Sequence, residues 1–134
     1  MKRSLEIDAP PTEVWRVLTN PELVREWAAA YLDGVSIRTT WRQGETVTWK
    51  APDGSTRAVG AIAAIVPERL LRIAYDAEAG GAFPDTFEIV AKEDRTWLSV
   101  SAEKLDEDDL EAAEEAIREI KSLAEESAQI HRLR

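Results

Sequence analysis

The most regular pattern of apolar and polar positions in this chain lies near its end. From Asp106 to Ile130 the sequence contains neither glycine nor proline, and its apolar residues recur at spacings of three and four. The recurring positions are Leu110, Ala113, Ile117, Ile120 and Ala124. This spacing predicts one long helix with an apolar face, and glutamates occupy the opposite face. Such a helix needs an apolar surface to cover it, and we expect the preceding residues to supply that surface.

The first thirty residues predict a strand followed by two short helices. Residues 4–7 alternate between polar and apolar side chains, as in a half-buried strand. Pro11 can occupy the first turn of a helix, where its missing N–H has no partner to lose. Asn20 can then cap a second helix that begins at Pro21 and ends near Ala29.

After Gly34 the apolar positions repeat every second residue, which predicts strands. The predicted strands cover residues 35–41, 47–51, 56–66, 71–76, 87–91 and 98–102. Gly60, inside the third of these strands, indicates a bulge or a tight bend. Residues 77–84 contain two adjacent glycines and are predicted to form a loop. The pattern as a whole predicts one α+β domain over residues 1–134, with an antiparallel sheet of about six strands.

Composition excludes several classes of site and partner. The 134 residues include no cysteine and one histidine, so disulfides, thiolate nucleophiles and zinc sites built from cysteine and histidine are excluded. The formal net charge of −9 repels phosphate backbones, which argues against nucleic acid as a partner. The longest apolar run, from Ala58 to Val66, is too short to cross a bilayer, and the first residues lack the apolar core of a signal peptide. We therefore expect a cytoplasmic protein without membrane insertion.

Three stretches resemble the single-domain relatives of the activator of heat-shock protein 90 ATPase. The first is IDAPPTEVWRVLTNPELVREW, from Ile7 to Trp27, which is similar to the opening of these proteins. Residues 41–75 resemble their succession of glycine turn, tryptophan-bearing strand, Asp-Gly turn and proline corner, and residues 86–101 resemble their closing hairpin. The resemblance implies the helix-grip fold shared with START lipid-transfer domains, pollen-allergen-like carriers and aromatic polyketide cyclases. In that fold a curved antiparallel sheet of six to seven strands wraps around the C-terminal helix, with a cavity between them.

The aromatic residues are the most informative candidates for a ligand site. They lie mostly at helix ends or on the apolar side of a predicted strand, where a ring suits either an ordinary core or a ligand pocket. Because the resemblance implies a cavity, we predict that several rings line it. The predicted ligand-binding residues are Trp27, Tyr31, Trp49, Ile73, Tyr75, Phe87, Ile89, Leu98, Val100, Ala113, Ile117 and Ile120. Many relatives begin the last helix with an aromatic ring, which this chain lacks, so either the sheet closes further onto the helix or the cavity is larger.

Groups suited to catalysis are few in this sequence. His131, the one histidine, lies near the C-terminus and is expected to be an exposed tail residue. Asp76 and Glu103 lie at predicted strand ends, where they are either solvated rim residues or carboxylates that face the cavity. Arg38 and Arg72 alternate with apolar neighbours and are expected to point outward. We therefore assign no catalytic residue, no metal site and no cofactor.

These features support three functional hypotheses. The first is binding of a small hydrophobic molecule, such as a lipid, a sterol or an aromatic polyketide, between the sheet and the last helix. The second is a cyclase- or hydrolase-like enzyme in the same cavity, which requires an inward-facing polar group in a perturbed environment. The third, suggested only by the family, is a co-chaperone of heat-shock protein 90. The protein is expected to be a monomer or a homodimer, with an outward-facing Trp97 that is either exposed or covered by a second copy.

Overall fold

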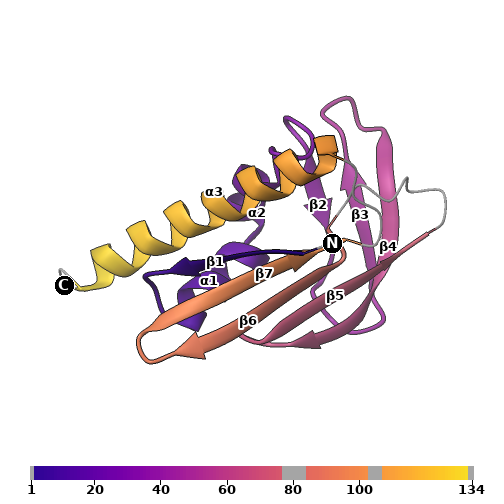
Figure 1. The fold of residues 1–134 in the computed structure, drawn as a ribbon. Coiled ribbons are helices and arrows are strands. Elements are labelled where there is room, and N and C mark those ends of the chain that lie inside the picture. The colour runs from indigo at the N-terminus through magenta and orange to yellow at the C-terminus, as the bar shows by residue number, and fades with distance from the viewer. Residues whose placement is uncertain (1, 77–83, 103–106, 133–134) are drawn as a thin grey trace.

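The computed structural model describes residues 2–76, 84–102 and 107–132 (Figure 1). In chain order the elements are β1 (Lys2–Ile7), α1 (Pro11–Thr19), α2 (Pro21–Ala28), β2 (Ser36–Arg38), β3 (Thr46–Lys50), β4 (Thr56–Val66), β5 (Leu70–Tyr75), β6 (Thr86–Lys92), β7 (Arg95–Ser101) and α3 (Glu107–Arg132). This order confirms the predicted succession of strand, two short helices, strands and one long helix. Of the predicted loop at 77–84, only Pro84 is described. Glu103 and Asp106 also lie outside the described residues.

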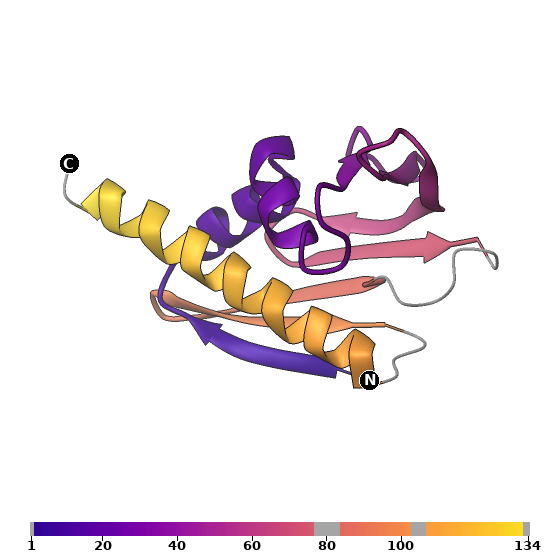
Figure 2. The same cartoon turned by 90° about the horizontal axis from the view of Figure 1, so that it is seen from above.

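The strands form one seven-stranded antiparallel sheet in the order β1-β7-β6-β5-β4-β3-β2. The first strand therefore closes one edge beside β7, with Lys2 opposite Ser101 and Ile7 opposite Thr96. The short β2 forms the other edge and pairs with β3. The sheet curves around the helices, and α3 crosses its β1 and β7 side while α1 and α2 lie next to α3 (Figures 1 and 2). The prediction of a helix-grip α+β fold is confirmed.

Local sequence explains how α1 and α2 begin and end. Each helix starts with a proline, Pro11 in α1 and Pro21 in α2, at a position where no backbone N–H is needed. Between them, the side-chain oxygen of Asn20 accepts a hydrogen bond of 3.0 Å from the backbone N–H of Glu22, which caps α2 as predicted. The cap fixes where α2 starts and hence the direction of Trp27 near its end.

Four residues predicted for the apolar face of the last helix, Ala113, Ile117, Ile120 and Ala124, lie on the buried face of α3, and the side chain of Leu110 lies outside the described residues. The buried residues of α3 are Ala113, Ala116, Ile117, Ile120, Ala124 and Ala128. Most of these are alanines, which let α3 lie close to α1 and α2. None of the helices within the described residues is long and apolar enough to cross a membrane.

Polar contacts fix α3 to the first strand. The guanidinium of Arg3 on β1 lies 3.0 Å from a carboxylate oxygen of Glu114. Further along α3, the carboxylate of Glu125 accepts a hydrogen bond of 2.8 Å from the backbone N–H of Asp8. Part of the polar face of α3 therefore contacts protein rather than solvent, and this sets where the helix lies along β1.

A second pair of contacts fixes the end of α3 to α1. Arg16 donates a hydrogen bond of 2.6 Å to the hydroxyl of Ser127. His131 Nδ1 lies 2.6 Å from Oε1 of Glu13, whose side chain is only 9% exposed. His131 is exposed as expected, at 59%, but it lies within α3, which carries its imidazole onto α1.

The buried carboxylate of Glu13 has a perturbed pKa. Burial on its own raises that pKa, but the neighbouring Ser127 hydroxyl, the His131 imidazole and the Arg16 guanidinium together lower it below its ordinary value. The charged form of Glu13 is therefore favoured in the folded protein. Its contribution to stability is present at neutral pH and is lost as the pH falls through its folded-state pKa.

Gly60 serves a different purpose from the one predicted. In the β3–β4 pair the register shifts between Trp49 and Lys50 of β3, and in the β4–β5 pair it shifts between Ile62 and Ala64 of β4. Neither shift lies at Gly60. A Cβ atom built on Gly60 would lie 2.6 Å from the carbonyl oxygen of Ala74. The glycine is therefore needed because the backbones of β4 and β5 approach closely at this point.

Replacing Gly60 with alanine is expected to lower the free energy of unfolding by about 2 kcal/mol, because the added methyl group forces β4 away from β5. Urea denaturation followed by circular dichroism measures this change. The control is Ala63→Val, which adds bulk at an exposed position of the same strand and should alter stability by less than about 0.5 kcal/mol. Equal stability of the Gly60→Ala variant and the parent protein would contradict the proposed close approach.

The protein is expected to lose stability as the pH falls from about 5 to about 3, and Glu13→Gln should flatten this dependence. The reason is that Glu13 binds a proton more readily in the unfolded chain than in the fold, where its pKa is lowered. Urea midpoints measured between pH 7 and pH 3 test the prediction. The control is Glu111→Gln, which changes an exposed glutamate of α3. It should keep the parent dependence of stability on pH. The same slope in all three proteins would show that Glu13 has no special role.

Candidate functional site

Aromatic side chains from four elements and one loop meet inside the curved sheet. We call Trp27, Tyr31, Trp49, Tyr75 and Phe87 the aromatic cluster. The ring centroids of Trp27 and Phe87 are 5.4 Å apart, those of Trp27 and Trp49 are 6.4 Å apart, and those of Tyr31 and Trp49 are 5.8 Å apart. The interplanar angles lie between 66° and 84°, so the three pairs pack edge to face.

The alternation of side chains along each strand explains why its aromatic ring points inward. Trp49 is directly opposite Ile37 on β2 and Ala58 on β4, so these three side chains share one face of the sheet. On β6, Phe87 shares the same inner face. The inner face of the sheet and the buried face of α2 thus bring rings that are far apart in the sequence into contact.

The polar atoms of the cluster are joined by hydrogen bonds. The indole N–H of Trp27 donates to the carbonyl oxygen of Val17 at 3.0 Å, which links α2 to α1. The indole N–H of Trp49 donates to the hydroxyl of Tyr75 at 3.1 Å, and that hydroxyl donates to the carbonyl oxygen of Pro84 at 3.0 Å. Each of these rings is therefore fixed in orientation as well as packed.

The hydroxyl of Tyr75 stays protonated in this environment. Burial is the main reason that its pKa lies above the ordinary tyrosine value, and the nearby Tyr31 and Asp85 raise it further. The hydrogen bond from Trp49 acts in the opposite direction but is outweighed. Tyr75 therefore serves as a neutral hydrogen-bonding group at physiological pH and is unsuited to act as a base.

Exposure differs between the two ends of the cluster. Trp27, Trp49 and Phe87 are at most 1% exposed, so the middle of the cluster is filled by rings. Tyr31 and Tyr75 are only partly buried. The cluster thus has a closed interior and a tyrosine-bearing end that reaches toward solvent.

The remaining predicted site residues are all buried, and all of them except Ala113 belong to the same core. Those on the strands are Ile73, Ile89, Leu98 and Val100, and those on α3 are Ala113, Ile117 and Ile120. The sequence did not show that Trp27 of α2 would be the ring that contacts both Trp49 and Phe87. It also gave no signal for Asp85, because Pro84 and Asp85 precede a strand without any repeating pattern. That these residues bind a ligand stays a prediction.

Other candidate groups lie away from the cluster. Asp76 is exposed and donates its backbone N–H to the carbonyl oxygen of Val59. Arg38 and Arg72 are exposed on the outer side of the sheet, as predicted. Among the described residues, no group of three or more histidine, cysteine, aspartate or glutamate side chains is arranged to hold a metal ion.

Trp97 lies on the outer face of β7, as its alternation with Ser99 predicted. Its ring is partly buried, and Nζ of Lys92 lies 5.2 Å from the ring centroid. Val90, directly opposite on β6, is 54% exposed. Coverage of this face by a second copy stays a prediction.

The same fold occurs in solved structures of low sequence identity. The solution structure of an AHSA1-like protein from Aeromonas hydrophila has a TM-score of 0.64 and 18% identity, over 95% of this chain and 94% of that chain. The crystal structure of CalU16 from Micromonospora echinospora has a TM-score of 0.67 and 18% identity, over 96% of this chain and 83% of that chain. The Aha1 dimer from Colwellia psychrerythraea has a TM-score of 0.67 and 13% identity, over 93% of this chain and 95% of that chain. At such identities the likeness shows a shared fold.

Sequence comparison identifies the family. None of the curated proteins matches this chain. The family model described as Activator of Hsp90 ATPase homolog 1-like protein matches residues 8–125, which is most of the chain. Apart from Ile7, the match covers all three stretches that carried the resemblance. The protein belongs to the family of Activator of Hsp90 ATPase homolog 1-like proteins.

Proposed function

We propose that this protein binds a small hydrophobic molecule at the tyrosine-bearing end of the aromatic cluster. The observation that carries the proposal is the difference in exposure within the cluster. Tyr31 and Tyr75 remain partly exposed beside rings that are completely buried. An apolar surface that is open at one end and rigid behind is a common arrangement in ligand sites.

The energetics favour binding at this end over insertion between the inner rings. Each edge-to-face pair contributes about 0.5–1.5 kcal/mol beyond the area it buries. A ligand between Trp27 and Trp49 would have to break such pairs and the hydrogen bonds of both indoles. A ligand that extends the cluster beyond Tyr31 and Tyr75 leaves all of these interactions in place.

The polar groups at this end favour a ligand with one hydrogen-bonding group. The hydroxyl of Tyr75 is buried next to Trp49 and the Pro84 carbonyl, and Tyr31 and Asp85 lie near it. A purely hydrocarbon ligand would cover the partly exposed residues Tyr31 and Asp85 without offering them a hydrogen-bonding partner, which costs free energy. We therefore favour an aromatic or alicyclic molecule that carries a hydroxyl or a carbonyl group.

Titration with 1-naphthol is expected to quench tryptophan fluorescence saturably, and naphthalene should bind about tenfold more weakly because it lacks the hydroxyl group. Trp49→Phe should remove much of the quenching, since Trp49 contacts both Tyr31 and Tyr75. Trp97→Phe is the matched control and should leave the titration unchanged, because Trp97 lies on the outer face. The absence of saturable quenching by either compound in protein with a native near-ultraviolet circular dichroism spectrum would overturn the proposal.

Tyr75→Phe is expected to reduce the preference for 1-naphthol over naphthalene while binding of naphthalene is kept. The variant preserves the ring but removes the hydroxyl that lies between Trp49 and Pro84. It should also lower the free energy of unfolding by about 1–3 kcal/mol, because buried polar groups lose their partner. Binding is compared below the melting temperature of both proteins. An unchanged preference would place the ligand elsewhere.

A further inference from the structure

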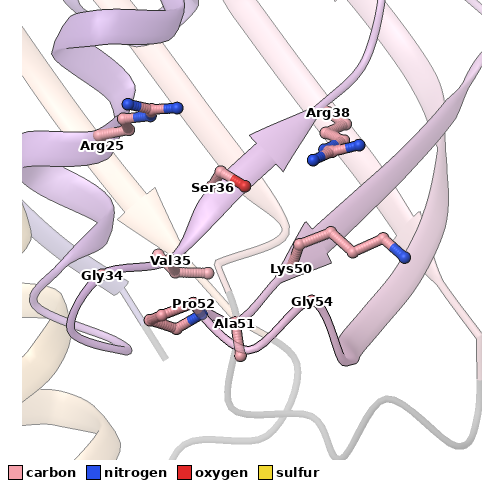
Figure 3. A pocket seen from close by; sticks show the side chains of 9 residues that line it. All are labelled: Arg25, Gly34, Val35, Ser36, Arg38, Lys50, Ala51, Pro52 and Gly54. Carbon is pink, nitrogen blue, oxygen red and sulfur yellow. The ribbon is translucent and has the colours of Figure 1, made fainter.

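A concave site lies at the β2 edge of the sheet. It is a cavity of about 400 Å³, formed by the end of α2, the chain through Gly34 and β2, and the turn that follows β3 (Figure 3). We call it the edge pocket. Its volume is that of a site for a small molecule. Ser36, Arg38 and Lys50 alternate with the inward-pointing Ile37 and Trp49, so the edge pocket is separate from the aromatic cluster.

The edge pocket is basic in a strongly acidic protein. Arg25, Arg38 and Lys50 line it, and no carboxylate does, although the chain has 26 acidic residues and a net charge of −9. None of these three cations forms an ion pair with a carboxylate of the described residues. In contrast, several other basic residues do: Arg3, Arg16, Arg95, Arg118 and Lys121. Three like charges that line one cavity without a counter-charge attract an anion.

Strand register explains why two of the cations and a hydroxyl share this pocket. Ser36 and Lys50 are directly opposite in the β2–β3 pair, so their side chains leave the same face of the sheet. Arg38, two residues after Ser36, points to that face as well. Arg25 comes from α2, and Ser36 lies between it and Arg38 in Figure 3. The cations therefore approach the pocket from three elements.

Two residues that line the pocket, Gly34 and Pro52, pack closely, with the backbone of Gly34 against the ring of Pro52. Gly34 has a φ of +74°, and a Cβ atom built on it would lie 2.5 Å from Cγ of Pro52. This contact brings the segment before β2 against the turn after β3. Gly54, also on the pocket wall, has a φ of +87°. The shape of the pocket thus depends on two backbone conformations that other residues rarely adopt.

We propose that the edge pocket binds the phosphate group of a small phosphate monoester. Guanidinium groups match phosphate oxygens with paired hydrogen bonds, and the lysine ammonium and serine hydroxyl supply further donors. A phosphate monoester carries a charge of about −1.5 to −2 at pH 7, which compensates three cations better than one carboxylate does. The cavity is also larger than a phosphate ion, so the organic part of the ester fits inside it. The site does not depend on the hydrophobic ligand proposed above.

The test uses three probes that differ at one carbon: glucose, glucuronate and glucose 6-phosphate. Titration of the ¹⁵N-labelled protein with glucose 6-phosphate should show saturable shifts of the backbone amides of residues 34–38, 50–51 and 53–54, and this binding should weaken as salt is added. Glucuronate should bind at least about tenfold more weakly, and glucose should cause no such shifts. Equal affinity for glucuronate would overturn the assignment to phosphate. Inorganic phosphate that binds as tightly as glucose 6-phosphate would overturn the assignment to an ester.

Matched variants separate a specific site from general electrostatic attraction. Arg38→Gln and Lys50→Gln should each weaken binding of glucose 6-phosphate by about tenfold or more. Arg72→Gln removes the same charge from an exposed position of β5 outside the pocket and should leave binding unchanged. Comparable weakening by all three variants, or an absence of saturable shifts in the folded parent protein, would overturn the proposal. Quenching by 1-naphthol should be the same in all of these proteins.

Discussion

The edge-to-face packing of Trp27 against the sheet is the interaction on which the rest of this structure depends. The same indole contacts Trp49 on β3 and Phe87 on β6, and β4 and β5 lie between those strands. In a flat sheet, strands three places apart would be about 14 Å from each other. One side chain can contact both only if the sheet curves toward it. The curvature and the position of α2 are therefore two aspects of one packing arrangement.

Trp27 packs on the concave face of the sheet, and the long helix α3 contacts the helix α2 that carries this ring. The helix α3 lies across α1, α2 and the β1 edge, with a face made mostly of alanines. The large rings come instead from α2 and the strands. The same two elements serve both proposed sites. Trp27 of α2 and Trp49 of β3 belong to the aromatic cluster, whereas Arg25 of α2 and Lys50 of β3 line the edge pocket.

The sequence predicted those features that depend on neighbouring residues. Alternation gave the strands, the spacing of three and four gave α3, and proline with asparagine gave the start of α2. Features that depend on which elements become neighbours were missed. Arg25, Arg38 and Lys50 have no meaningful spacing in the sequence, and they meet only because α2, β2 and β3 are adjacent in space. The contact of His131 with Glu13 was missed for the same reason, because it joins the two ends of the chain. Gly60 shows a related limit: the residue was recognised as unusual, but the cause lies in the backbone of another strand.

The position of β1 has a consequence for how the protein is made. Its neighbour in the sheet is β7, and the side chain of Arg3 and the backbone N–H of Asp8 find their partners on α3. The partners on β7 and α3 are at least 89 residues away in the sequence, so a ribosome releases them long after β1 has emerged. During synthesis the first strand must wait unpaired while the hairpins of β3 to β7 form from nearby segments. This strand has only two large apolar residues, Leu5 and Ile7, and its other residues are charged or polar. Such a composition suits a strand that stays in water until its partners are synthesised.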